Sequence, residues 1–248
     1  MNNPFSLTGK TILVTGASSG IGQATAVNCA RQGAKTIITA RKAENLQKTF
    51  EELVGSENIQ ILADLCSEED VQNLVSQIPV LDGIVFCAGK ALTLPFNFAS
   101  TEKFEEMFKV NLFSSVEMLR LLLKKKKIAK SASLVFISSV DGNDTFHVGN
   151  SVYSATKAAM ESMTKSIALE LAPKGIRVNT IRPGMIDTKL IRTGGITEEQ
   201  LQENLNEYPL KMIGKHDDIA LASIYLLSDA SSWVTGTSLV VDGGYTIK

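Results

Sequence analysis

The sequence lacks any long apolar run: no stretch approaches the ~18 uninterrupted apolar residues of a membrane span. Residues 1–10 include a proline and a glycine among scattered apolar residues, so they lack the continuous apolar core of a signal peptide. Cysteine is also scarce. The three cysteines, an odd number without paired or metal-ligand spacing, are Cys29, Cys66 and Cys87. These absences predict a protein of a reducing compartment, the cytoplasm, with neither a membrane anchor nor a metal site.

The chain also has almost no net charge. A formal charge of −1 provides no global attraction to nucleic acid or to an anionic membrane. Apolar residues make up 44% of the 248 residues and charged ones 21%, which is ordinary globular usage and argues against disorder. No linker, repeat or shift in composition divides the chain, so we expect residues 1–248 to form a single domain with a substantial core.

Seven short runs dominated by Ile, Val and Leu have the pattern of strands buried on both faces. They are residues 11–15, 35–39, 59–62, 83–87, 134–138, 176–181 and 238–241. Helical patterns between them include residues 21–31, 43–54, 68–77, 101–127 and 153–171. This alternation predicts a doubly wound, Rossmann-type α/β fold, with a parallel sheet of seven strands flanked by helices. Residues 188–215 break the rhythm, and we expect them to form a substrate lid at the carboxyl ends of the strands.

A glycine-rich turn, Gly16-Ala-Ser-Ser-Gly-Ile-Gly22, directly follows the first strand and precedes a helical pattern. In such a turn Gly16 permits the tight bend, Gly20 lets the backbone approach a pyrophosphate, and Gly22 allows close helix packing. The spacing departs from the usual G-x-G-x-x-G, so an ordinary turn is the alternative. Its position predicts a dinucleotide-binding turn, whose remaining contacts are Ser18, Ser19 and Ile21.

The second strand ends without the acid that normally holds the ribose 2′-hydroxyl of NAD. Arg41 and Lys42 follow it instead. A guanidinium pairs well with a 2′-phosphate, which favours NADP(H) over NAD. The alternative is that both side chains are solvated charges at the start of the next helix.

Tyr153 and Lys157 are four residues apart and therefore share one face of a helix. An ammonium beside a phenol stabilises the phenolate and lowers the pKa of the tyrosine, which makes it an acid or base. Such a pair is common by chance. Its context is more specific, because the helix follows a strand whose end carries Ser138 and Ser139, and an earlier helix begins near Asn111.

Over essentially its whole length the chain resembles the short-chain dehydrogenase/reductase family. The motifs that carry the resemblance are residues 15–22, Asp64-Leu65, Cys87-Ala88-Gly89, Asn111, Ser139, Tyr153 with Lys157, Pro183-Gly184 through Thr188, and residues 241–244. The resemblance implies an oxidoreductase that moves a hydride between NADP(H) and a carbonyl or hydroxyl carbon.

The resemblance also implies roles. Tyr153 would exchange a proton with the substrate oxygen, and Ser139 would polarise that oxygen. Lys157 would hold the nicotinamide ribose and lower the Tyr153 pKa, and Asn111 would hold a water that links the lysine to solvent. Asp64 would contact the adenine, and Ile186 and Thr188 would contact the carboxamide of the nicotinamide. The full set of further expected cofactor contacts is Asp64, Leu65, Ala88, Gly89, Pro183, Gly184, Ile186 and Thr188.

Each of these residues has a simpler alternative. Asn111 or Asp64 could cap a helix, and Ser139 or Thr188 could be a turn residue. One position departs from the family, which usually has Asn where this chain has Cys87. We expect a weakened link between strands there and no catalytic cysteine, because no histidine lies close in sequence.

The only dense charge run is Lys124 to Lys127, followed by Lys130. It is either a solvated helix terminus or a docking site for an acidic partner. The chain resembles the 3-oxoacyl-acyl-carrier-protein reductases of fatty acid biosynthesis, which often have another basic residue where Lys174 lies. This resemblance implies that the substrate is a 3-oxoacyl thioester on acyl carrier protein. Alternatives are a small alcohol, sugar or polyketide as substrate, or a catalytically silent dinucleotide-binding sensor. The family also implies a homotetramer or homodimer.

Overall fold

The computed structural model describes residues 3–187 and 197–248 and is built around a parallel sheet. The strand order is β3-β2-β1-β4-β5-β6-β7, and each neighbouring pair is parallel. The strands are β1 (Thr11–Thr15), β2 (Lys35–Ala40), β3 (Ile59–Leu62), β4 (Leu81–Phe86), β5 (Ile128–Ile137), β6 (Arg177–Pro183) and β7 (Ser238–Val241). The predicted seven-stranded, Rossmann-type sheet is confirmed.

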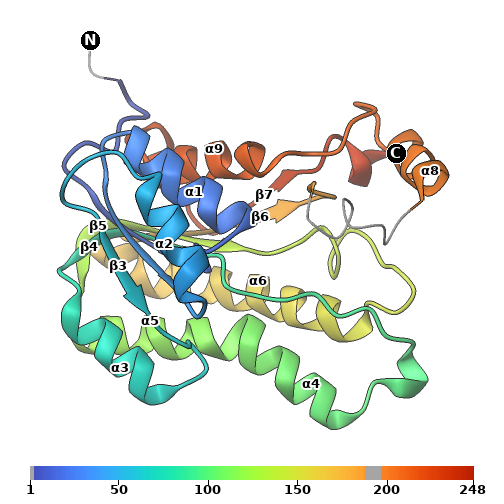
Figure 1. Ribbon diagram of the computed structural model, residues 1–248, viewed down its shortest axis with the longest axis horizontal. Coiled ribbons are helices and arrows are strands. Elements are labelled where there is room, and N and C mark those ends of the chain that lie inside the picture. The colour runs from blue at the N-terminus through green and yellow to red at the C-terminus, as the bar shows by residue number, and fades with distance from the viewer. Residues whose placement is uncertain (1–2, 188–196) are drawn as a thin grey trace.

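Helices cover both faces of the sheet (Figure 1). On one face lie α1 (Gly20–Arg31), α2 (Ala43–Glu51) and α9 (His216–Leu227), and on the other lie α3 (Glu68–Gln77), α4 (Thr101–Phe108), α5 (Ser114–Lys124) and α6 (Ser151–Leu171). Two apolar cores separate the layers. One contains Leu46 and Ile219 of the first set of helices, and the other contains Leu74 and Met118 of the second. Strands with apolar side chains toward both cores explain the Ile-, Val- and Leu-rich runs.

The helix expected over residues 101–127 differs from the structure. A π-helical turn, η2 (Lys109–Phe113), separates α4 from α5, and α5 ends at Lys124. Lys126 has a φ of 56°, in the left-handed region that ends a helix. The next strand then begins at Ile128, six residues before the strand expected at 134–138.

The predicted lid, residues 188–215, lies partly outside the described residues. Its described part contains α8 (Glu198–Glu207). At its end Gly214 pairs with the segment that follows β6, where the Gly214 amide donates to Met185 O (3.1 Å) and the Asp187 amide donates to Gly214 O (2.8 Å). The lid function remains a prediction. None of the described helices has the length and apolarity of a membrane span.

Candidate active site

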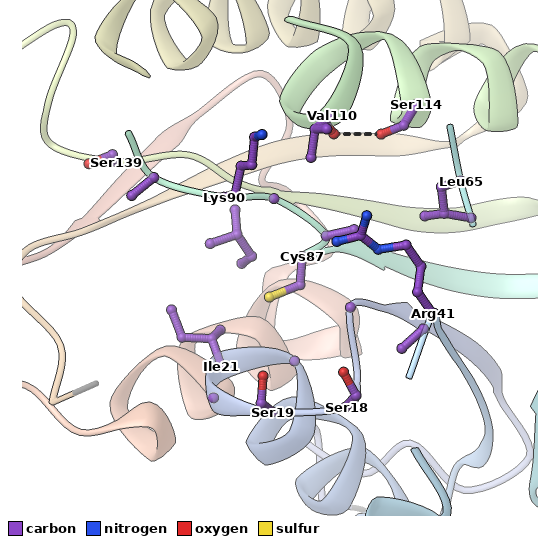
Figure 2. Close-up of a pocket in the computed structure, with 18 of the residues that line it drawn as sticks. Ser18, Ser19, Ile21, Arg41, Leu65, Cys87, Lys90, Val110, Ser114 and Ser139 are labelled. Carbon is purple, nitrogen blue, oxygen red and sulfur yellow. Dashed lines mark hydrogen bonds between the residues drawn. The ribbon is translucent and has the colours of Figure 1, made fainter. Parts of the chain in front are cut away.

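A cavity of about 640 Å³ lies at the carboxyl ends of the strands. The strand order reverses between β1 and β4, and open α/β sheets bind ligands at that point. Figure 2 shows Ser18 and Ser19, on the turn before α1, at one side of the cavity and Val110 and Ser114 at the opposite side, with Cys87 between them. The volume is in the usual range for cofactor sites, roughly 300–1,000 Å³.

The fold brings nearly all the sequence-predicted site residues to this cavity. Those that line it are Gly16, Ser18, Ser19, Gly20, Ile21, Gly22, Arg41, Lys42, Asp64, Leu65, Ala88, Gly89, Ser139, Tyr153, Lys157, Pro183, Gly184 and Ile186. Asn111 is fully buried behind the cavity wall. Thr188 lies outside the described residues.

The glycine-rich turn fits a pyrophosphate because side chains would obstruct it. Gly16 has a φ of 65°, and a Cβ there would lie 2.9 Å from Ala88 Cα at the end of β4. A Cβ on Gly22 would collide with the carbonyl oxygen of Gly16. Since α1 has no acidic residue in its first turn, its N-terminal N–H groups and dipole are available to an anion.

The ends of β1 and β4 are linked by hydrogen bonds although Cys87 stands where the family usually has Asn. The Thr15 hydroxyl at the end of β1 accepts hydrogen bonds from the amides of Cys87 (3.0 Å) and Ala88 (3.1 Å). Burial raises the pKa of Cys87 to about 12, which opposes formation of a thiolate. Cys87 is thus a neutral thiol in the cavity wall, and Thr15 links β1 to β4.

The capping alternative for Asp64 is wrong. Ser67 is the N-cap of α3, and its hydroxyl accepts a hydrogen bond from the Asp70 amide (3.3 Å). The Asp64 carboxylate instead accepts from the Cys66 amide (2.9 Å) and lines the cavity. Arg41, at the end of β2, is exposed at the same end of the cavity.

The two serines after β5 have different partners. Ser138 donates a hydrogen bond to Glu161 Oε1 (2.8 Å), so its hydroxyl is committed to a buried carboxylate. The Ser139 hydroxyl accepts from the Asp141 amide (3.1 Å) and is close enough to Tyr153 to influence its pKa. Ser139 is therefore a turn residue that also lies beside Tyr153, and its role in polarising the substrate oxygen stays a prediction.

The pKa of Tyr153 is raised, mainly by burial, and the negative charge of Asp141 raises it further, whereas the nearby Ser139 hydroxyl partly offsets both. The lowering of this pKa by Lys157 stays a prediction. Lys157 Nζ lies 5.7 Å from the centroid of the Tyr153 ring and donates to Ile137 O (2.8 Å). Burial lowers the pKa of Lys157 to about 8, although the negative charge of Glu161 raises it.

Asn111 lies in the π-helical turn and does not cap a helix, so that alternative is wrong. Its Oδ1 accepts from the Lys90 amide (2.9 Å), and its Nδ2 donates to Lys90 O (3.0 Å) and Thr156 Oγ1 (3.1 Å). The side chain thus joins the segment after β4 to α6, the helix of Tyr153. Its role in holding a water remains a prediction.

A buried ion pair between Glu161 and Arg182 lies near the site, and the sequence did not predict it. Glu161 is one helical turn after Lys157 on α6 and is 3% exposed. Both its carboxylate oxygens accept from Arg182 Nε (2.9 and 2.7 Å), and Ser238 Oγ donates to Oε2 (3.1 Å). Arg182 also donates to Asp144 Oδ2 (2.7 Å) in the loop after Ser139. The pair therefore joins α6, β6, β7 and that loop.

Several lining residues were not predicted. Among them are Asn45, Cys66, Lys90, Val110, Ser114 and His216. One general signal was available for His216, because helices that follow parallel strands begin at the carboxyl edge of the sheet, where ligands bind. The others follow only from three-dimensional packing.

Comparisons with known proteins point to one family. Residues 16–246 match the family model described as enoyl-(acyl carrier protein) reductase. The chain is 34% identical to 3-oxoacyl-[acyl-carrier-protein] reductase of Rickettsia felis, covering 96% of this chain and 97% of the relative. It is 32% identical to L-xylulose reductase of Mesocricetus auratus, covering 97% and 98%.

A solved structure of a short chain dehydrogenase/reductase family protein superposes with a TM-score of 0.85 at 30% identity, covering 97% of this chain and 99% of the other. The family binds a nicotinamide dinucleotide, in keeping with the glycine-rich turn. The chain belongs to the short-chain dehydrogenase/reductase family of oxidoreductases.

Proposed function

We propose that the chain is an NADP(H)-dependent reductase that converts a carbonyl to a hydroxyl group, with Tyr153 as the acid. The observation that carries this proposal is that Ser139, Tyr153 and Lys157 all line the cavity that also contains the glycine-rich turn, with Lys157 Nζ 5.7 Å from the centroid of the Tyr153 ring. The nicotinamide of a bound dinucleotide would supply the hydride. The side chains of the site would supply the proton.

A tyrosine phenol is protonated at neutral pH, so Tyr153 would donate its proton to the carbonyl oxygen as charge develops there. Ser139 would hydrogen-bond the same oxygen. The Lys157 ammonium, 5.7 Å from the ring centroid, stabilises the phenolate once the proton has left.

Arg41 supports NADP(H) as the cofactor. Replacing Arg41 with alanine should raise the KM for NADPH about tenfold or more, since a charge-assisted bond to the 2′-phosphate contributes about 1.5–3 kcal/mol. The KM for NADH, which lacks that phosphate, should stay the same. Steady-state kinetics with both cofactors measure the difference. Equal KM values for NADPH in wild type and variant would favour a solvated charge at Arg41.

A 3-oxoacyl thioester on acyl carrier protein is the substrate class we favour, because of the similarity to carrier-protein reductases. The similarity to a sugar reductase supports a sugar or small ketone as the second candidate. Steady-state assays of acetoacetyl carrier protein, small ketones and L-xylulose, each with NADPH and NADH, separate the two. Activity confined to sugars or small ketones would exclude the carrier-bound substrate.

The lysine run lies at the opposite edge of the sheet from the cavity. It immediately precedes β5, and Ser138 and Ser139 follow the other end of this ten-residue strand, about 30 Å away. Lys127 is also engaged, since its Nζ donates to Ile78 O (2.6 Å). A carrier docked on the run would therefore need the cavity of a second copy of the chain. Docking of an acidic carrier protein on the lysine run is part of the proposal. The proposal also includes assembly as a homotetramer or homodimer and a cytoplasmic location.

Charge reversal tests the docking proposal. Changing Lys124, Lys125 and Lys130 together to glutamate should raise the KM for acetoacetyl carrier protein about tenfold and weaken its salt dependence. The KM for a small ketone should not change. If the two substrates respond alike, the run is a solvated helix terminus.

A further inference from the structure

His216 extends the cavity from α9, a helix that the sequence analysis did not connect with the site. It is the first residue of α9 and lines the cavity. Its Nε2 lies 3.5 Å from the position that a Cβ on Gly20 would occupy. Gly20 is the first residue of α1, so the imidazole ring lies against the N-terminus of the helix that receives the phosphates.

Contacts between helices hold the start of α9 in this position. The Asn28 amide of α1 donates to Asp217 Oδ1 (2.8 Å), one residue after His216. The Asp218 carboxylate accepts from the Lys215 amide (2.7 Å) and closes the first turn of α9. The location of His216 is therefore set by the packing of α9 on α1.

The imidazole has no competing partner nearby. Within residues 3–187 and 197–248, no hydrogen bond or ion pair involves the His216 ring, and the residue is only half-buried. Asp217 is engaged by Asn28, and Asp218 by the backbone of its own turn. A ring N–H facing the cavity is thus free to donate to an anion.

We propose that His216 donates a hydrogen bond to a phosphate oxygen of the dinucleotide bound at the N-terminus of α1. The inference rests on the dinucleotide site of the proposed function. Backbone N–H groups of α1 would bind the phosphate from one side. The imidazole of α9 would bind it from another, so that two helices, one at each end of the sequence, close around one phosphate.

Calorimetric titration of the full chain with NADP⁺ tests the proposal. His216→Ala should weaken NADP⁺ binding about three- to tenfold, the effect of one hydrogen bond. His216→Gln retains an N–H donor and should recover part of the affinity. Binding of adenosine 2′-monophosphate, which lacks the pyrophosphate, should be the same in all three proteins, whereas Arg41→Ala should weaken it.

Proton NMR provides a direct readout, because the chain has only two histidines. His147→Gln assigns the two Cε1–H signals. NADP⁺ and inorganic pyrophosphate should both shift the His216 signal, and adenosine 2′-monophosphate should not. Unchanged NADP⁺ affinity in His216→Ala, or a His216 signal that does not respond to NADP⁺, would overturn the inference about His216 and leave the proposed function intact. A wild-type chain that binds no dinucleotide would overturn the proposed function as well.

Discussion

Replacing Tyr153 with phenylalanine is expected to lower kcat/KM for carbonyl reduction about 10²- to 10⁴-fold, the usual contribution of a positioned general acid. The change removes only the hydroxyl that Ser139 contacts and leaves the ring beside Lys157. Dinucleotide affinity and melting temperature should therefore change little. Steady-state kinetics with the best carbonyl substrate, together with calorimetric titration of NADP⁺, measure both effects.

Tyr225→Phe is the matched control, since Tyr225 lies on α9 outside the residues that line the cavity. It removes the same hydroxyl elsewhere and should leave kcat/KM unchanged. Full activity of Tyr153→Phe would contradict the assignment of the acid. A wild-type chain that binds dinucleotide but reduces no carbonyl would instead support the silent sensor.

The fold was predictable because its signals are local. Strands buried on both faces need continuous runs of Ile, Val and Leu, and these runs predicted the bounds of β1 to β4, β6 and β7 to within two residues. The start of β5 was placed too late because its first residues, Ile128 to Ser131, are half-buried or exposed and only the first two of them are apolar. The π-helical turn was not predictable, since it accompanies the tertiary contacts of Asn111 with Lys90 and Thr156.

The site was predictable where its chemistry follows short motifs. The glycine-rich turn and the Tyr153–Lys157 pair can be found from spacing alone, and parallel strands place them at one edge. The direction of the Tyr153 pKa shift could not be predicted, because it depends mainly on the burial of the phenol in the folded chain. Glu161 and Arg182 are 21 residues apart, and a sequence does not show that two distant charges are buried together.

The second large effect is expected at this pair. Arg182→Met should lower the free energy of unfolding by about 3 kcal/mol, because it leaves the Glu161 carboxylate buried without its cation. Urea denaturation followed by circular dichroism measures the change. Arg120→Met is the control, since the Arg120–Glu117 pair is 63% and 57% exposed and its loss should matter little.

A double variant distinguishes two contributions to the loss of stability: the loss of the Glu161–Arg182 attraction and the burial of an unpaired carboxylate. Glu161→Gln removes the negative charge but keeps the shape and hydrogen-bonding capacity of the side chain. In Glu161→Gln with Arg182→Met no unpaired carboxylate is left at position 161, so the double variant should be more stable than the sum of the two single changes predicts. If Arg182→Met costs no more stability than Arg120→Met, the pair does not hold the site together. Additive single changes would show that Glu161 and Arg182 stabilise the fold through separate contacts, with Asp144 and the serine hydroxyls as the partners to test next.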